Sequence, residues 1–116
     1  MIGFRIILLV FLLVCFSCNH KKQDAIAFDS QKWKVQQKQD FPYRDAMLDD
    51  LIKSRILKGI KKGDVFQLLG EPSRMDTHYL FYRVAQQRLG AFPLHTKTLV
   101  INMDTFDVVQ TVRIHQ

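Results

Sequence analysis

A short helix with a well-defined end, near the middle of the chain, constrains the fold more than any other stretch. Val65, Leu68 and Leu69 recur at spacings of three and four residues, so they form one apolar stripe on a helix. Gly70 lies where a helix C-terminus favours a left-handed residue, and Pro72 cannot continue the helix. A helix of roughly two or three turns is marginal by itself. Its stripe must therefore be buried against flanking parts of the chain.

A first helix is predicted ahead of it, over Asp45–Leu57. Asp49 and Lys53 form an acid-to-base pair at i, i+4 on this helix. Asp49 and Asp50 are neighbours on the chain and point in different directions, so they cannot act together on one substrate atom. We interpret them as part of a solvated face. The apolar residues at helical spacing are Leu48, Leu51, Ile52 and Ile56.

After Pro72 the pattern changes to a period of two, which is typical of strands. Strands are predicted over His78–Val84, Thr96–Met103 and Val108–His115. The residues between the first two strands, which include Gly90, are expected to form a loop. The last two strands should be joined by a tight turn that contains aspartates at its ends, Asp104 and Asp107.

Three adjoining strands with short connections form an antiparallel meander with one apolar face. The third strand should place Val108, Val112 and Ile114 on that face. The two helices are the only elements available to cover it. We therefore predict an α+β fold of two layers, with two short helices packed on a three-stranded antiparallel meander in the order ααβββ. This domain is expected to span residues 44–116.

The N-terminal residues have the features of an export signal. Arg5 is followed by an unbroken apolar run, Ile6–Val14, which is shorter than the ~20 residues that span a bilayer. Ser17 directly precedes Cys18, as in a bacterial lipobox, where the thiol receives a diacylglycerol. We interpret residues 1–17 as a lipoprotein signal peptide and Cys18 as the lipidation site. A plain secretory signal or an uncleaved anchor are the alternatives.

Residues 18–43 are expected to be a lipidated N-terminus followed by a flexible tether. The segment is rich in Gln and Lys and poor in aliphatic residues. Phe28 and Trp33 are exceptions, because the only tryptophan of the chain is seldom placed in a free linker. We expect the Phe28–Trp33 segment to lie against the domain as an extended strand or an arm. The alternative is that Trp33 anchors a binding partner.

The chain carries a formal net charge of +6, with 17 Lys and Arg against 11 Asp and Glu. The mature chain would have a charge of +5, because Arg5 is the only charged residue of the signal. An exported protein meets little nucleic acid, so we expect no nucleic-acid partner. Anionic lipid head groups or an acidic protein partner fit this charge better.

The sequence contains no pattern of catalytic or metal-binding residues. Its four histidines, His20, His78, His95 and His115, do not have the spacing of a zinc site. The serines lack a nucleophile-elbow frame, and the glycines do not form a phosphate-binding loop. We predict that the protein is not an enzyme and has no cofactor, no metal and no small-molecule substrate.

Apolar residues in the loop between the first two strands are candidates for binding. Phe92 and Leu94 lie where loops are usually polar, with Arg88 and Lys97 nearby. These residues either fold back onto the core or form an exposed patch that contacts a partner protein or lipid head groups.

The run from Gly59 to Pro72, Gly-Ile-Lys-Lys-Gly-Asp-Val-Phe-Gln-Leu-Leu-Gly-Glu-Pro, followed by the aromatic Tyr79–Tyr82 segment, resembles the BamE (SmpA/OmlA) family of bacterial envelope lipoproteins. The resemblance covers roughly residues 45–114 and the lipobox. One departure is Lys61, which stands where the family commonly has a Thr or Ser that caps the second helix.

The resemblance implies a lipid-anchored, non-catalytic scaffold or adaptor that faces the periplasm and is accessory to outer-membrane protein assembly or envelope integrity. The expected partners are the membrane, through the N-terminal lipid, and an envelope protein. Asn19 after the lipidated cysteine favours the outer membrane, and the inner membrane stays open. The alternatives are a protein inhibitor of an envelope or secreted enzyme with the same fold, and a module that binds lipid head groups.

Overall fold

The structure, a computed structural model, describes residues 24–116. The predicted signal peptide and the predicted lipidation site at Cys18 lie outside the described residues. Within them, no helix is both long and apolar enough to cross a membrane.

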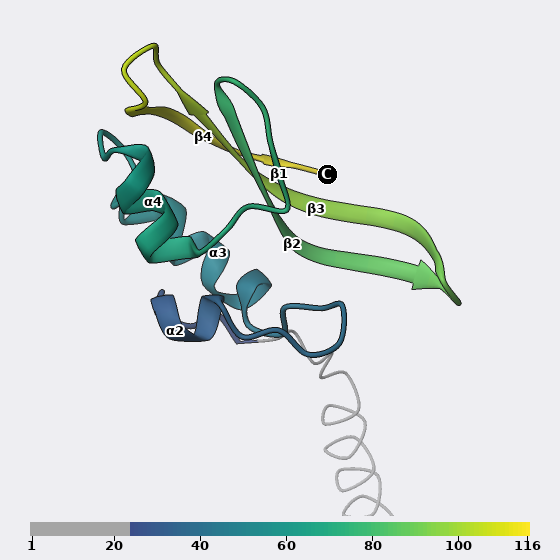
Figure 1. The fold of residues 1–116 in the computed structure, drawn as a ribbon. Coiled ribbons are helices and arrows are strands. Elements are labelled where there is room, and N and C mark those ends of the chain that lie inside the picture. The colour runs from purple at the N-terminus through teal and green to yellow at the C-terminus, as the bar shows by residue number, and fades with distance from the viewer. Residues whose placement is uncertain (1–23) are drawn as a thin grey trace, which may run out of the picture.

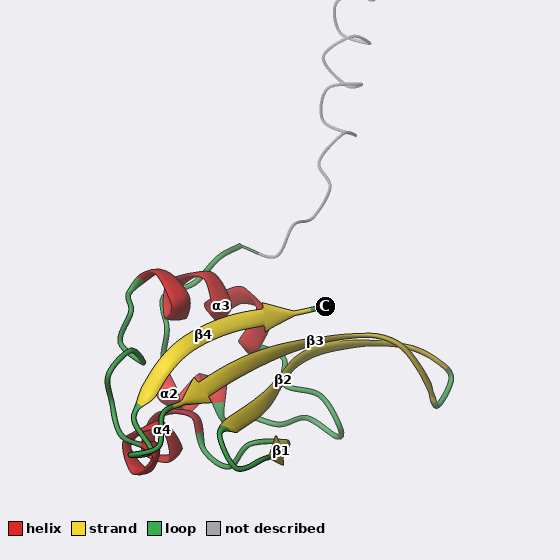
Figure 2. Cartoon of the chain, turned by 90° about the horizontal axis from the view of Figure 1, so that it is seen from above, coloured by secondary structure: helices red, strands yellow, loops and turns green. Residues whose placement is uncertain are grey.

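Helices lie against one face of a twisted antiparallel sheet (Figures 1 and 2). The strands follow one another in the sheet in chain order, β1-β2-β3-β4, so every connection joins neighbours. The predicted α+β class with an antiparallel sheet is confirmed. The elements of residues 24–116 are α2 (Ser30–Trp33), α3 (Arg44–Lys53), α4 (Lys62–Leu69), β1 (Arg74–Met75), β2 (Tyr79–Leu89), β3 (Phe92–Met103) and β4 (Val109–His115).

The sheet has a fourth strand and the helical layer a third helix that the sequence did not indicate. β1 is two residues long and pairs with β2, Arg74 with Phe81 and Met75 with Leu80. α2 is four residues long, and Asp29 caps it by accepting hydrogen bonds from two backbone N–H groups. Both elements are too short to show a period of their own, so the predicted count of three strands and two helices was too low.

The β2–β3 hairpin is longer than predicted, because both strands continue through the expected loop. β2 runs to Leu89 and β3 begins at Phe92. Register shifts between Arg83 and Ala85, and between Gln87 and Arg88, interrupt the alternation of side chains. These bulges hide the strand period in the sequence while the backbone pairing continues.

The core lies between the helices and one face of the sheet. Leu99, Ile101 and Met103 of β3 are buried there, as predicted. On β4 the prediction that Val108 faces the core is wrong. A register shift next to Met103 places Val109 opposite Met103 instead. The other fully buried members of the core include Trp33, Met47, Leu51, Leu57, Val65, Leu69, Leu80 and Tyr82.

α3 ends earlier than predicted, at Lys53 rather than Leu57. The chain leaves the helix through Arg55, which has a positive φ of 56°, and Leu57 still reaches the core with 1% exposure. Gly59 and Ile60 then pair with the start of β4: the Gly59 N–H donates to the Val109 carbonyl over 3.0 Å, and the Val109 N–H donates to the Ile60 carbonyl over 2.9 Å. A non-helical turn therefore replaces the last predicted helical turn, and pairing with β4 follows it at Gly59 and Ile60.

The N-terminus of α4 lacks a side-chain cap, as the sequence predicted. Lys61 is the N-cap residue and its side chain makes no capping hydrogen bond. The Lys62 N–H donates instead to the carbonyl of Asp107 over 2.9 Å. Asp107 has a positive φ of 58° and ends the turn predicted to begin at Asp104, whose side chain accepts from the Phe106 and Val108 N–H groups. The predicted turn is confirmed, and it also supplies the missing cap.

The C-terminus of α4 is capped by side chains from two other parts of the chain. Its last carbonyls have no partner within the helix. The Ser30 hydroxyl donates to the Leu68 carbonyl over 2.6 Å, and the Lys34 ammonium donates to the Gln67 carbonyl over 2.6 Å. The Tyr82 hydroxyl donates to the carbonyl of Gly70 over 2.8 Å. We call the segment before α3 that contains Ser30 and Lys34 the N-terminal arm. The end of α4 therefore joins this arm to the sheet.

We predict that alanine has opposite effects on the free energy of unfolding at Gly63 in α4 and at Gly70, the C-cap of α4. Gly70 has φ 76° and ψ −162°, a conformation that alanine reaches only with strain, so Gly70→Ala should lower the free energy of unfolding by about 1–3 kcal/mol. Gly63 is helical and a Cβ there meets nothing within 4 Å. Gly63→Ala should therefore raise the free energy of unfolding by about 0.5–1 kcal/mol. Urea denaturation measures both, and equal effects would contradict the capping geometry.

The hydroxyl of Tyr82 should make the fold sensitive to alkaline pH. Burial raises the pKa of Tyr82 and the charge of Arg44 partly opposes this. Because the folded state holds the proton above the unfolded-state pKa, stability is complete below about pH 10 and is lost as the pH rises above it. Tyr82→Phe should cost about 1 kcal/mol at neutral pH and should lose less stability than the unsubstituted chain above about pH 10 in urea titrations. Parallel pH profiles would contradict this.

Candidate interaction surface

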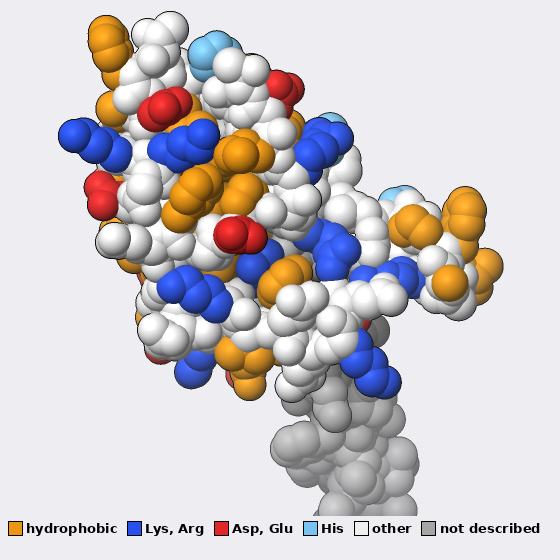
Figure 3. All heavy atoms as spheres, viewed as in Figure 1, with side chains coloured by type: hydrophobic (Ala, Val, Ile, Leu, Met, Phe, Trp, Pro, Cys, Tyr) orange, Lys and Arg blue, Asp and Glu red, His pale blue; other side chains and the backbone are white. Residues whose placement is uncertain are grey.

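The predicted binding residues Phe92 and Leu94 lie at the far end of the β2–β3 hairpin. Leu89 is 72% exposed, Phe92 69% and Leu94 52%. We call these three residues the hairpin tip. Figure 3 shows apolar side chains gathered at the end of a projection that extends beyond the body of the molecule. The alternative in which Phe92 and Leu94 fold back onto the core is therefore wrong.

The hairpin tip is exposed because the two strands extend past the helices that cover the rest of the sheet (Figures 1 and 2). Gly90 has a positive φ of 61° in the turn between them. The polar residues Gln86 and Thr96 meet across the strands below the tip, with a hydrogen bond of 3.0 Å. The apolar tip is thus separated from the core by polar side chains, so it does not extend the core.

The two cations predicted beside the tip are both paired with carboxylates of the body. Arg88 donates to both carboxylate oxygens of Asp40, over 2.8 and 3.2 Å. Lys97 lies 2.8 Å from a carboxylate oxygen of Asp45. The hydrogen bond from Arg88 lowers the pKa of the Asp40 carboxyl, so this pair stays ionised at neutral pH. Arg88 and Lys97 therefore connect the hairpin to the body.

Trp33 is a core residue and not an exposed anchor. Its side chain is 0% exposed, with Phe28 tilted against it at a ring separation of 6.1 Å. The predicted contact of the Phe28–Trp33 segment with the domain is confirmed, with a short helix in place of a strand. The Phe28 N–H also donates to Asp50 over 2.7 Å, so Asp50 is not merely solvated. Packing of the chain therefore begins before residue 44, the predicted start of the domain.

Arg44 is a buried cation that sequence reasoning missed. It is 3% exposed and its guanidinium lies 3.4 Å from the ring centre of Phe41 and 4.9 Å from that of Trp33. It donates to the carbonyls of Trp33 and Arg83 over 2.9 and 2.7 Å. Burial lowers the pKa of Arg44 to about 10, so the group stays charged at neutral pH. In a sequence, a charged residue at the start of a helix is normally interpreted as exposed. The aromatic residues Trp33 and Phe41, which precede Arg44 in the chain, were the only signal of its burial.

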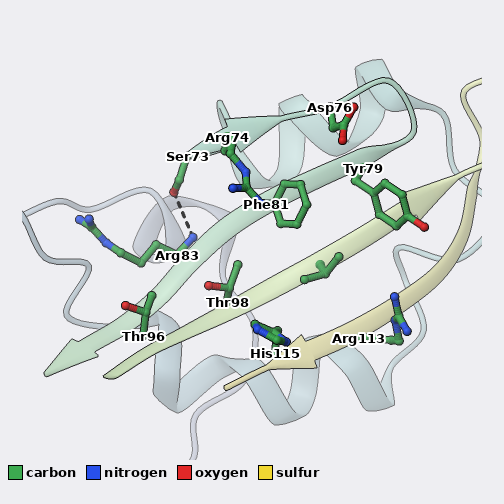
Figure 4. Close-up of a pocket in the computed structure, with 11 residues that line it drawn as sticks. Ser73, Arg74, Asp76, Tyr79, Phe81, Arg83, Thr96, Thr98, Arg113 and His115 are labelled. Carbon is green, nitrogen blue, oxygen red and sulfur yellow. Dashed lines mark hydrogen bonds between the residues drawn. The ribbon is translucent and has the colours of Figure 1, made fainter. Parts of the chain in front are cut away.

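The face of the sheet opposite the helices is uncovered and forms a second candidate surface. A hollow of about 590 Å³ lies on it (Figure 4). We call this surface the open face. The strand register arranges its side chains in rows that cross the sheet, and one row runs Arg74–Phe81–Val100–Arg113. A parallel row is Arg83–Thr98–His115.

The side chains of the open face combine aromatic and basic groups. The rings of Tyr79 and Phe81 stack at a separation of 6.1 Å, and the Arg74 guanidinium lies 4.2 Å from the Phe81 ring centre. The prediction that Val112 and Ile114 face the core implied only that Arg113, which lies between them, is on the other side of β4. It did not show that Arg74 joins the same row, because β1 was not predicted.

Residues 24–116 hold no cluster of metal-ligand side chains. No group of three or more His, Cys, Asp or Glu side chains in residues 24–116 comes together in a way that could hold a metal ion. His78, His95 and His115 are exposed on different strands or turns.

No protein-family model matches the chain, and no curated protein matches it either.

We predict that removing the guanidinium of Arg44 loosens the arm. Arg44→Ala removes the donor to the buried Trp33 carbonyl and the part-buried Arg83 carbonyl, and it removes the cation from two rings, so it should cost about 2–4 kcal/mol. Trp33 fluorescence during urea denaturation reports the change. The matched control is Lys53→Ala on the same helix, where the exposed pair with Asp49 should contribute within about 0.5 kcal/mol. Equal costs for the two substitutions would contradict the structural role of Arg44.

Proposed function

We propose that the protein is a lipid-anchored, non-catalytic scaffold or adaptor of the bacterial envelope, and that its hairpin tip contacts a partner protein. The observation that carries the proposal is the exposure of Leu89, Phe92 and Leu94 on a projection that no other described element covers. Exposed apolar side chains in one cluster are typical of interaction sites.

The tip is well suited to docking because it is held in place before a partner arrives. Arg88 and Lys97 link the stem of the hairpin to Asp40 and Asp45. A projection fixed in this way loses little conformational freedom on binding, which favours affinity. Phe92 provides a large apolar group for a partner pocket.

The order of α3 and α4 followed by an antiparallel meander supports a BamE-like fold within the α+β class. The Leu-Leu-Gly end of α4 also agrees with that family, because Gly70 adopts the positive φ that the motif needs. A BamE-like protein would be tethered through Cys18 to the outer membrane, on its periplasmic face. Its contribution would be accessory to outer-membrane protein assembly or envelope integrity.

A partner protein is favoured over lipid head groups as the target of the tip. A surface that binds anionic head groups needs cations that are free to approach phosphate. The cations nearest the tip, Arg88 and Lys97, already pair with carboxylates. No contact within residues 24–116 specifically favours an inhibitor of an enzyme.

The proposal is tested by photo-crosslinking in intact cells with a benzophenone amino acid at position 92. We expect a discrete crosslinked protein, identified by mass spectrometry. The matched control carries the same probe at Phe106, which is 83% exposed in the turn at the other end of β3. Phe92→Ser should abolish co-purification of that partner while changing the free energy of unfolding by no more than about 0.5 kcal/mol.

Two outcomes would contradict the proposed adaptor function. One is crosslinking of position 92 to lipid alone, and the other is an identical set of crosslinked proteins from positions 92 and 106. The lipid anchor is tested separately by mass spectrometry of the mature N-terminus. An unmodified Cys18 would remove the anchor from the proposal.

A further inference from the structure

The open face carries two arginines at opposite ends of one row, with apolar side chains between them. The row Arg74–Phe81–Val100–Arg113 crosses all four strands. Since neighbouring strands are about 4.8 Å apart, the backbone positions of Arg74 and Arg113 are about 14 Å apart. Figure 4 shows the two arginines at opposite margins of the hollow, with Phe81 between them.

These two arginines have no carboxylate partner within residues 24–116. The three ion pairs of this part of the chain are made by Lys53, Arg88 and Lys97. The Arg74 guanidinium lies over the ring of Phe81. Both arginine side chains belong to exposed residues, so their charges are accessible.

The other charged groups that line the hollow form no ion pair with these two arginines. Among residues 24–116, Asp76 is the only acidic residue that lines the hollow, and its carboxylate accepts a hydrogen bond from the Thr77 N–H. Arg83 lines the hollow too, but its guanidinium bonds to the Gln39 carbonyl and points away (Figure 4). The open face is therefore positively charged at both margins and apolar at its centre.

From this juxtaposition we propose that the open face binds an acidic, amphipathic segment of a partner protein. The apolar side of the segment packs on the stacked rings of Tyr79 and Phe81, which are half-buried, and carboxylates on its two flanks pair with Arg74 and Arg113. A helix with its side chains is about 10–12 Å wide, which matches the separation of the two arginines. Arginine and aromatic side chains are also the groups that contribute most at protein interfaces.

Other occupants fit this arrangement less well. A second copy of the chain that docked through the same face would place arginines against arginines, which is unfavourable. A single phosphate of a lipid head group cannot bridge two cations this far apart, and it gains nothing from the apolar centre. The open face is separate from the hairpin tip, because its side chains lie on a different part of the molecule. It also differs in chemistry, because it carries accessible cations.

Synthetic peptides serve as probes because the partner is unidentified. The test peptide is an amphipathic sequence with a leucine stripe flanked by glutamates on both sides. Its matched control peptides replace the glutamates by lysines, or the leucines by serines. Binding is followed by fluorescence anisotropy of the labelled peptide with the full chain in nonionic detergent, at low and at high salt.

We expect the glutamate–leucine peptide to bind, and the two control peptides to bind at least about tenfold more weakly. The double variant Arg74→Gln, Arg113→Gln should raise the dissociation constant of the test peptide about tenfold, and high salt should have a similar effect. The control variant Lys53→Gln, Lys58→Gln removes the same charge elsewhere and should bind the peptide like the unsubstituted chain. All four positions are exposed, so circular dichroism should show unchanged folding.

Three results would overturn the proposal. The first is equal binding of the glutamate and lysine peptides, and the second is an equal loss of affinity in the two double variants. The third is that Arg74→Gln, Arg113→Gln weakens adsorption to phosphatidylglycerol vesicles without affecting the peptide, which would make the open face a membrane surface. A failure of the Phe92 crosslinking experiment would leave these results unchanged, so the two proposals are separable.

Discussion

The C-terminus of α4 is the point on which the rest of the structure depends. A helix end leaves carbonyl groups without partners, and such groups are costly when they are not solvated or bonded. Here the carbonyls of Gln67, Leu68 and Gly70 receive hydrogen bonds from Lys34, Ser30 and Tyr82. One donor set comes from the N-terminal arm and the other from the sheet. The same helix end therefore joins the arm, the helical layer and the sheet.

That joint explains why the residues before α3 belong to the packed structure. The arm places Trp33 in the core and brings its backbone carbonyl to Arg44. Arg44 in turn donates to a carbonyl of β2, so the buried cation connects the arm to the sheet. Its burial is tolerated because two aromatic rings and two carbonyls surround the guanidinium.

With the helices and the arm on one face, two surfaces remain available for contact with other molecules. The hairpin tip is apolar, and the nearest cations are paired with the body. The open face is basic at its margins and apolar at its centre, and its arginines lack carboxylate partners within residues 24–116. The two surfaces therefore differ in the chemistry of the partner each would accept.

Several features of the fold could be predicted because they depend on local interactions. The α4 stripe, the positive φ at Gly70 and the turn at Asp104–Asp107 follow from residues close together in the chain. The buried face of β3 follows from a strict period of two. β1 and α2 could not be predicted because each is shorter than one period of its pattern. The length of the hairpin was missed because its bulges break the alternation that marks a strand.

The sequence by itself determined the order of α3, α4 and the three longer strands, and the side of β3 that faces the core, because both follow from hydrophobic periodicity. It also narrowed the binding residues to a few candidates, without showing whether they were exposed. Only the tertiary structure decided that Trp33 is buried, that Phe92 is exposed, and that Arg74 and Arg113 share one row. Those outcomes depend on strand register and on which elements cover which face. Both are set by contacts between residues far apart in the chain, and no local pattern records them.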